Sequence, residues 1–307
     1  GITMKLSISS YNKYQMCKRL YWLEKVEGWS EKRTKPWLEF GSNFGELMAF
    51  IDVEGTDKAL ERVPEMFGNP FKAAEVEYLV RKWEIEYGDQ PEPVLNIDDQ
   101  AGNEYEIDID LSHLVDDQFE LIMTGFIDKV WDDNDVPAIT ERKTTKDLIN
   151  DSSTYWKRLL FDPQIVGYSF GLSYILDTPV EKGTYEVFRK PNKDIDKLFD
   201  HEGMVASDYR DKLLNGLYEP LKRKARMVTR KPYLITKQMR SDFAHEFASV
   251  ASEIHYRTQR SAELAEPFME WTRDKDACDK FLPCVYKPFC SRESTLENMY
   301  QIQQKQR

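Results

Sequence analysis

The chain has 307 residues, of which 41% are hydrophobic and 32% are charged, and its formal net charge at pH 7 is −11. This length provides core for one large domain or two small ones. The acidic balance excludes a protein that coats nucleic acid non-specifically, although a local basic channel remains compatible with it. Since no apolar run reaches the length of a membrane span and the N-terminus lacks an apolar signal region, we expect a cytoplasmic protein without a membrane partner.

The N-terminal part of the chain predicts helices. Tyr11 to Val26 is locally basic and has the spacing of one helix, and a second helix is predicted from Trp37 to Phe50. Residues 52–118 carry no chemical motif and are interpreted as an insertion of unknown role. Within this insertion, Ala73 to Tyr87 predicts a helix and Glu104 to Leu111 alternates like an exposed acidic strand.

The centre of the chain predicts a β-hairpin. Leu121 to Trp131 is rich in branched and aromatic residues, an acidic turn follows, and Val136 to Lys143 forms a second extended run. Ser153 and then Asp162-Pro163 each open a predicted helix, the second with an N-cap Asp and Pro at its first position. Thr184 to Arg189 predicts a further strand.

Three charged side chains are expected to meet on this hairpin. On an extended strand, Glu141 and Lys143 point to one side and Arg142 points to the other. The hairpin can bring Asp128 beside Glu141 and Lys143, and two carboxylates with an ammonium suit a divalent cation next to a scissile phosphate. The alternative is a solvated strand face, but Ile127 and Ile139 place these charges at the ends of apolar strands, where bare carboxylates are costly.

Three short motifs follow one another in the order of a known family. They are Gly125-x-x-Asp128 on one strand, Glu141-x-Lys143 on the next, and Gln164-x-x-x-Tyr168 on the following helix. This ordered set resembles the RecB-like branch of the PD-(D/E)XK nucleases. The resemblance implies an α/β, restriction-endonuclease-like fold, in which a mixed central sheet is flanked by helices and followed by a helical C-terminal region.

The resemblance also implies roles for these residues. Asp128 and Glu141 would hold one or two Mg²⁺ or Mn²⁺ ions, with the backbone carbonyl of Arg142 as a further oxygen ligand. Lys143 would orient or activate the attacking water and offset charge on the phosphate. Gln164 and Tyr168 would position DNA, the alternative being a helix face that only packs on the sheet.

One part of the family pattern is missing. An upstream helix of the family carries Gly-x-x-x-His, whose imidazole binds metal, whereas the corresponding stretch here runs from Gly41 to Gly45. Glu46 is a candidate acidic substitute for that histidine, and a helix-surface glutamate is the alternative. The absence of the histidine is also the best support for a non-catalytic DNA-binding or scaffold protein that retains the fold.

The four cysteines occupy the positions seen in iron–sulfur members of this nuclease branch, which include helicase–nuclease subunits and CRISPR-associated exonucleases. Cys17 precedes the predicted nuclease core, and Cys278, Cys284 and Cys290 follow it. The resemblance implies a 4Fe-4S cluster that staples the two ends of the chain together. Zinc is an alternative, but structural zinc sites favour cysteine pairs two to four apart, and thiols without any metal are another.

Two basic stretches could line a DNA groove, namely Lys13 to Lys25 and Lys222 to Lys231, and solvated faces are the alternative. The aromatic residues expected to stack on single-stranded bases are Tyr11, Tyr14, Tyr21 and Trp22.

We therefore expect a metal-dependent deoxyribonuclease that acts as an exonuclease on single-stranded DNA or DNA ends in recombination or repair. Its expected partners are a recombinase, a helicase or a single-strand-binding protein, and by analogy with compact phage enzymes it would work in the host cytoplasm. The expected organisation is one nuclease domain over 1–307 with N-terminal helices (1–50), the insertion (52–118), the nuclease core (119–190), a helical region (191–270) and a cluster-binding segment (271–295).

Overall fold

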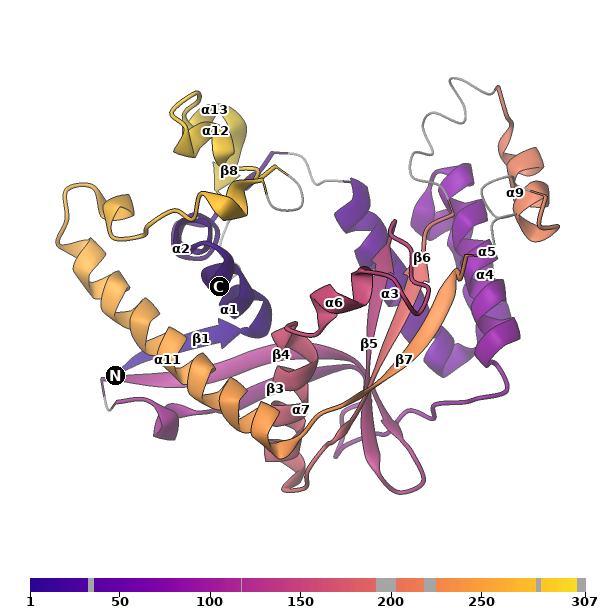
Figure 1. Cartoon of the computed structure of the whole chain (residues 1–307), viewed down its shortest axis with the longest axis horizontal. Helices are drawn as coiled ribbons and strands as arrows, with labels where there is room; N and C mark the ends of the chain where they lie inside the picture. The colour runs from indigo at the N-terminus through magenta and orange to yellow at the C-terminus, as the bar shows by residue number, and fades with distance from the viewer. Residues whose placement is uncertain (33–35, 117, 192–202, 218–224, 280–282, 303–307) are drawn as a thin grey trace.

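The fold is built on one mixed sheet, seen in the computed structural model of Figure 1. The structure describes residues 1–32, 36–116, 118–191, 203–217, 225–279 and 283–302. Within them, the sheet has the strand order β1-β4-β5-β6-β7, and β3 pairs beside β4. The strands are β1 (Ile2–Ser7), β3 (Asn103–Asp110), β4 (Phe119–Asp132), β5 (Pro137–Thr145), β6 (Lys182–Arg189) and β7 (Val228–Leu234).

The sheet forks along the long strand β4. The first half of β4, residues 119–124, pairs in parallel with β1, and its end, residues 129–132, pairs antiparallel with β5. Because β3 pairs along the other edge of β4, β1 and β5 share one edge and diverge from each other along it. Gly125 to Asp128 lies at this divergence, so the predicted Gly-x-x-Asp motif occupies the fork. The predicted hairpin is confirmed.

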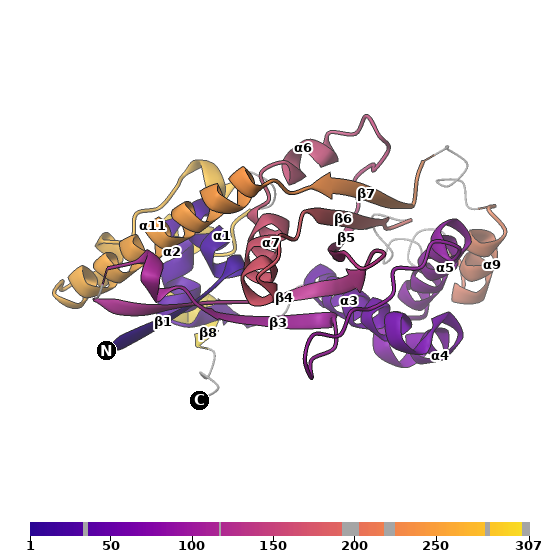
Figure 2. The ribbon, with the colours of Figure 1, turned by 90° about the horizontal axis from the view of Figure 1, so that it is seen from below.

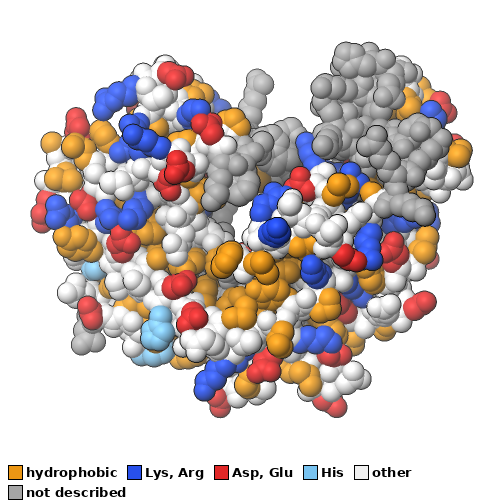
Figure 3. All heavy atoms as spheres, viewed as in Figure 1, with side chains coloured by type: hydrophobic (Ala, Val, Ile, Leu, Met, Phe, Trp, Pro, Cys, Tyr) orange, Lys and Arg blue, Asp and Glu red, His pale blue; other side chains and the backbone are white. Residues whose placement is uncertain are grey.

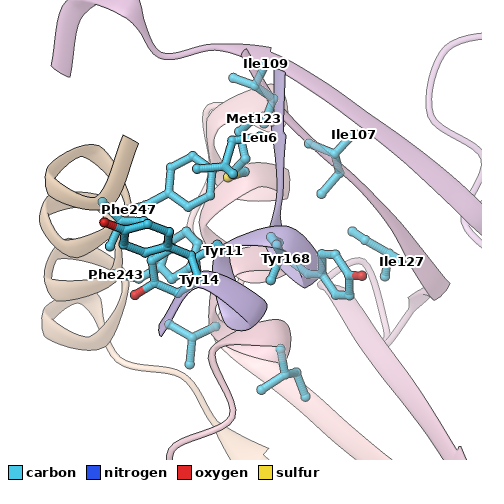
Figure 4. Close-up of a cluster of buried hydrophobic side chains, with 14 of the residues drawn as sticks. Leu6, Tyr11, Tyr14, Ile107, Ile109, Met123, Ile127, Tyr168, Phe243 and Phe247 are labelled. Carbon is cyan, nitrogen blue, oxygen red and sulfur yellow. The ribbon is translucent and has the colours of Figure 1, made fainter. Parts of the chain in front are cut away.

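Helices cover both faces of the sheet (Figure 2). On one face lie α1 (Ile8–Met16), α7 (Pro163–Leu176) and α11 (Lys237–Ala262). Their aromatic side chains interlock, and the rings of Phe243 and Phe247 on α11 lie beside Tyr11 of α1 (Figure 4). On the other face are α3 (Pro36–Glu54), α4 (Thr56–Phe67), α5 (Pro70–Tyr87) and α9 (Ala206–Leu214).

Tertiary contacts changed several local predictions. The helix predicted over Tyr11–Val26 breaks at Cys17, whose backbone is extended (φ −161°, ψ 118°), before α2 (Lys18–Tyr21) and a π-helical turn, Trp22–Val26. The strand predicted to be an exposed acidic one is half buried, because alternate residues of β3 pack in the core. Residues 52–118 thus contribute an edge strand of the sheet. The region 191–270, expected to be mostly helical, contributes strand β7.

The two ends of the chain meet beside α1. Strand β2 (Trp29–Glu31) pairs antiparallel with β8 (Tyr300–Ile302), which follows a short helix, α13 (Leu296–Met299). Trp271 is fully buried and stacks on Tyr21, with ring centroids 6.0 Å apart. Among the described residues, the other short helices are α6 (Tyr155–Leu159), α12 (Lys287–Cys290) and the 3₁₀ turns Ser112–Leu114, Pro267–Met269 and Asp276–Cys278.

Candidate active site at the fork of the sheet

The fork brings Asp128 of β4 to Glu141 of β5. The β4–β5 ladder pairs Lys129 with Thr140, and the next residue on each strand is Asp128 and Glu141. Asp128 Oδ2 accepts a 2.7 Å hydrogen bond from the backbone N–H of Arg142, the residue that follows Glu141 on β5. The predicted carboxylate pair is therefore assembled.

Burial disfavours the charged form of both carboxyl groups. Glu141 is only 4% exposed, and its Oε2 atom is buried without a hydrogen-bond partner among the described residues. Burial, and then repulsion by Asp128, hold the pKa of Glu141 well above its usual range; burial also raises the pKa of Asp128. A divalent cation would satisfy the free oxygen and compensate both charges, so this oxygen donor set fits Mg²⁺ or Mn²⁺.

Lys143 is fixed by three oxygen atoms. Its Nζ lies 3.4 Å from Glu141 Oε1, 3.2 Å from Asp162 Oδ2 and 3.0 Å from Gln164 Oε1. Burial would lower the pKa of Lys143, but attraction by Glu141 and Asp162 outweighs it and raises that pKa. The side chain therefore remains a cation and is suited to stabilise negative charge rather than to accept a proton.

The helix α7 closes the site on the side of Lys143. Gln164 reaches Lys143 and also donates from Nε2 to the hydroxyl of Tyr168 at 3.3 Å. The ring of Tyr168 lies over Gly125, where an added Cβ would come within 2.9 Å of it. Gly125 is thus required by this close contact. Gln164 joins the charged cluster, whereas Tyr168, 6% exposed, combines packing with a hydrogen bond to Gln164.

Asp162 is a member of the site that sequence reasoning did not include. Its carboxylate caps α7 by accepting from the backbone N–H of Gln164 at 3.0 Å, as predicted, and it also pairs with Lys143. One sequence signal could have found it. Asp162 is the N-cap of the helix that carries Gln164 and lies only two residues before it, so its carboxylate had to lie near the site.

Arg142 points to the opposite face of β5, as predicted, and enters a buried network of charges. Its guanidinium donates to Asp52 at 2.7 Å and to Glu186 at 2.9 Å. Arg230 donates to Glu186 at 2.6 Å, and Lys129 donates to Asp52 at 2.9 Å. Burial alone would raise the pKa of Glu186, but Arg142 and Arg230 hold it at about 2. Arg230 therefore does not line a DNA groove, because it is anchored here.

The candidate metal residue Glu46 lies apart from this cluster. It is exposed on α3, and the leading electrostatic neighbours of Asp128 and Glu141 are Arg142, Lys143 and Asp162. An added Cβ at Gly45 would meet no atom within 4 Å, so the family's histidine position faces open space. Within the described residues, no group of three or more His, Cys, Asp or Glu side chains is close enough to hold a metal ion.

The four cysteines are gathered at the junction of the chain ends. All four are free and partly buried. The pKa values of Cys278, Cys284 and Cys290 are raised, first by burial and then by charge repulsion from the other thiols, including Cys17. Within the described residues, which do not include 280–282, no three of these cysteines lie close enough together to hold a metal ion. Four cysteine thiolates are nevertheless the ligand set that iron–sulfur clusters use, so the residue types present suit such a cluster.

The aromatic residues predicted to stack on bases are wrong for that role. All four are less than 8% exposed because they pack into the main hydrophobic core; they are Tyr11, Tyr14, Tyr21 and Trp22. In the second basic stretch, residues 222–224 lie outside the described residues, and Lys231 lies on β7 with its ammonium 4.5 Å from the ring centroid of Trp156.

A comparison with protein-family models gives a match over most of the chain. A family model described as the PD-(D/E)XK nuclease superfamily matches residues 5–291. A solved structure from Eubacterium rectale, whose name marks it provisionally as an exonuclease, is 12% identical with a TM-score of 0.49 and covers 95% of this chain and 88% of its own. The structure of SSO0001 is 11% identical with a TM-score of 0.28, over 71% of this chain and 78% of its own. The search of curated proteins gives no match.

Proposed function

The chain belongs to the PD-(D/E)XK nuclease superfamily, and we propose that it is a Mg²⁺- or Mn²⁺-dependent deoxyribonuclease. One observation carries the proposal: Glu141 holds a buried, unpartnered carboxylate oxygen beside Asp128, while Lys143 is fixed against the same carboxylate. An unpaired buried carboxylate is costly for a protein that only has to fold, so this cost is best explained by a bound cation.

The side chains of the site have separate roles in the proposed phosphodiester hydrolysis. Asp128, Glu141 and the carbonyl of Arg142 would hold the cation. When bound, the cation would supply Lewis-acid polarisation of the phosphate and a more acidic attacking water. Lys143, kept cationic by Glu141 and Asp162, offsets the negative charge that builds on the phosphate in the transition state. Gln164 holds the ammonium of Lys143 in place through its amide oxygen.

The proposed substrate is single-stranded DNA or a DNA end, cleaved as an exonuclease in recombination or repair. A recombinase, a helicase or a single-strand-binding protein would deliver such ends. The four cysteines are proposed to hold a 4Fe-4S cluster with a structural role at the junction of the chain ends, distant from phosphate chemistry. Support for the cluster comes from the gathering of Cys17 with the three C-terminal thiols.

Cleavage of end-labelled single-stranded DNA in Mn²⁺ tests the enzyme directly. We expect activity in the unmodified protein and its loss in Glu141→Ala and Lys143→Ala, each by about 10³-fold, since each removes charge stabilisation in a water-poor site. Glu120→Ala, an exposed glutamate on the same strand as Asp128, is the matched control and should keep full activity. Cleavage that survives in both site variants, or none in the unmodified protein, contradicts the proposal.

A circular single strand separates exonuclease from endonuclease action. An exonuclease needs an end, so the circle should persist under conditions that degrade the linear strand of the same sequence. Equal degradation of both would show that the enzyme cuts internally.

A further inference from the structure

The turn between α6 and α7 presents two large apolar side chains to solvent. The backbone N–H of Asp162 donates to the carbonyl of Leu159 at 3.2 Å, so Leu160 and Phe161 are the two central residues of a tight turn. Leu160 is 59% exposed and Phe161 is 90% exposed. The turn follows α6 near the middle of the face in Figure 3, where hydrophobic side chains gather. Its tip is therefore an apolar surface.

Folding gives no reason for this composition of the turn. The central positions of turns are usually occupied by Gly, Pro, Asn, Asp or Ser, whose side chains or backbone suit the bend. A Phe ring that is 90% exposed adds almost nothing to the core. Single exposed apolar residues are ordinary on a protein surface, but Leu160 and Phe161 are adjacent and directly precede Asp162 of the candidate site. This position indicates a surface that another molecule covers.

The turn is held against the proposed catalytic centre. The hydroxyl of Tyr233 on β7 donates to the carbonyl of Leu160 at 3.4 Å. On the other side of the turn, Asp162 caps α7 through Oδ1, and its Oδ2 lies 3.2 Å from the Nζ of Lys143. Consecutive Cα atoms are about 3.8 Å apart, so Phe161 is anchored beside the lysine that is proposed to face the scissile phosphate.

The charges beside the turn suit an anionic strand. Near its end, α6 carries the exposed side chains of Lys157 and Arg158. Arg158 pairs with Asp147, whereas Lys157 makes no ion pair with another described residue. An exposed ring that accepts stacking, next to cations that attract phosphate, is the combination with which proteins bind single-stranded nucleic acid. The turn therefore suits a nucleic-acid strand that continues from the catalytic centre.

We propose that the ring of Phe161 stacks on an unpaired base of the strand whose neighbouring phosphate lies at Lys143. This inference rests on the proposed function and names its substrate class. A base inside a duplex is stacked between its neighbours, so its face becomes available only when the base leaves the stack. Phe161 thus favours single strands and frayed ends, and it fixes the position of the strand beside the catalytic centre.

Binding without metal tests the ring independently of cleavage. In EDTA, the fluorescence anisotropy of a labelled oligothymidylate should show about 10-fold weaker binding to full-length Phe161→Ala than to the unmodified protein, the effect of one lost stacking interaction. Phe161→Trp should bind like the unmodified protein, whereas Phe161→Leu, which is apolar without a ring, should bind like Phe161→Ala. Ile85→Ala, at a 75% exposed position on α5, is the control and should keep full affinity. Full affinity in Phe161→Ala or Phe161→Leu overturns the proposal.

A strand without bases shows whether the ring acts on a base or on the phosphates. An oligonucleotide of the same length, in which abasic units replace every nucleoside, should bind equally to Phe161→Ala and to the unmodified protein, because it offers nothing to stack on. A 10-fold loss with this strand as well overturns the proposal. Cleavage in Mn²⁺ separates the two claims: binding of oligothymidylate that depends on Phe161, in a protein that cleaves nothing, supports the stacking contact and rejects the nuclease. Full affinity of Phe161→Ala in a protein that does cleave rejects the contact while the nuclease stands.

Discussion

At the scale of single residues, the burial of the Glu141 carboxyl group lowers the stability of the folded protein, and folding alone gives no reason for it. Its carboxyl group is buried, borders Asp128 and leaves one oxygen unpaired. Catalytic groups are commonly held in such environments because their charge must act where water is scarce. The same residue should therefore limit the stability of the metal-free protein.

Glu141→Gln is expected to stabilise the metal-free protein at neutral pH by on the order of 1 kcal/mol. The amide does not ionise, so it avoids the cost of burying a second charge beside Asp128. Because the pKa of Glu141 is raised on folding, its contribution to stability is full below the unfolded pKa of about 4.3 and is lost as pH rises through the folded pKa. Thermal unfolding in EDTA should thus show that the Glu141→Gln variant is more stable than the unmodified protein at pH 7, and that this difference shrinks towards pH 4. A variant that is less stable than the unmodified protein at pH 7 would contradict this account.

At the scale of elements, strand β5 separates two charge systems. One face carries Glu141 and Lys143 towards α7, and the other carries Arg142 into the network with Asp52 and Glu186. This network fixes the peptide at Arg142, whose N–H binds Asp128. The strand can therefore present its carboxylate at a defined position.

Glu186→Gln should destabilise the protein by about 3 kcal/mol at pH 7, since it leaves Arg142 and Arg230 without their shared buried partner. The pKa of Glu186 is held at about 2, so the stabilisation from its charge is present above about pH 4.3 and is lost as pH falls through about 2. In urea unfolding, the difference in the free energy of unfolding between the Glu186→Gln variant and the unmodified protein should accordingly shrink as the pH falls from about 4.3 to about 2. Glu106→Gln on the exposed side of β3 is the control, and an equal effect there would argue against the network.

The sequence predicted local features of these elements better than distant contacts. The hairpin, the Asp162 cap and the opposite orientations of Glu141 and Arg142 follow from residues within a few positions of one another. The partners of Arg142 lie 90 residues away at Asp52 and 44 away at Glu186, and no local pattern marks them. The helix break at Cys17 could likewise not be predicted, because no glycine or proline, the usual helix-breaking residues, occurs there.

At the scale of the whole molecule, the two ends of the chain form one junction around the cysteines. Arg19 donates to the backbone carbonyl of Trp271 at 3.0 Å, and β2 pairs with β8. Residues 271–279 and 283–302 therefore pack on the N-terminal segment rather than extending away from it. The resemblance predicted that the cysteines meet, but the buried Trp271 was not predicted, because only the packed structure shows what covers it.

Cys17→Ser should lose iron and lower thermal stability together, by about 3 kcal/mol or more if the cluster is tightly bound. Anaerobically purified protein should be brown and contain iron and sulfide in equal amounts. Met16→Ala, an exposed neighbour, is the control and should retain both iron and melting temperature. A colourless preparation containing zinc, or a Cys17 variant that melts at the unmodified temperature, would contradict the cluster staple.

The most direct question about the whole protein is whether Asp128 and Glu141 bind the cation. Calorimetric titration of Mn²⁺ into the full-length protein, without nucleic acid, should show binding that weakens at least about 10-fold in Glu141→Gln, the loss expected when one charged ligand becomes neutral. Glu120→Gln should bind Mn²⁺ like the unmodified protein. Equal affinity in Glu141→Gln and the unmodified protein would contradict the assignment of this carboxylate pair as the metal site.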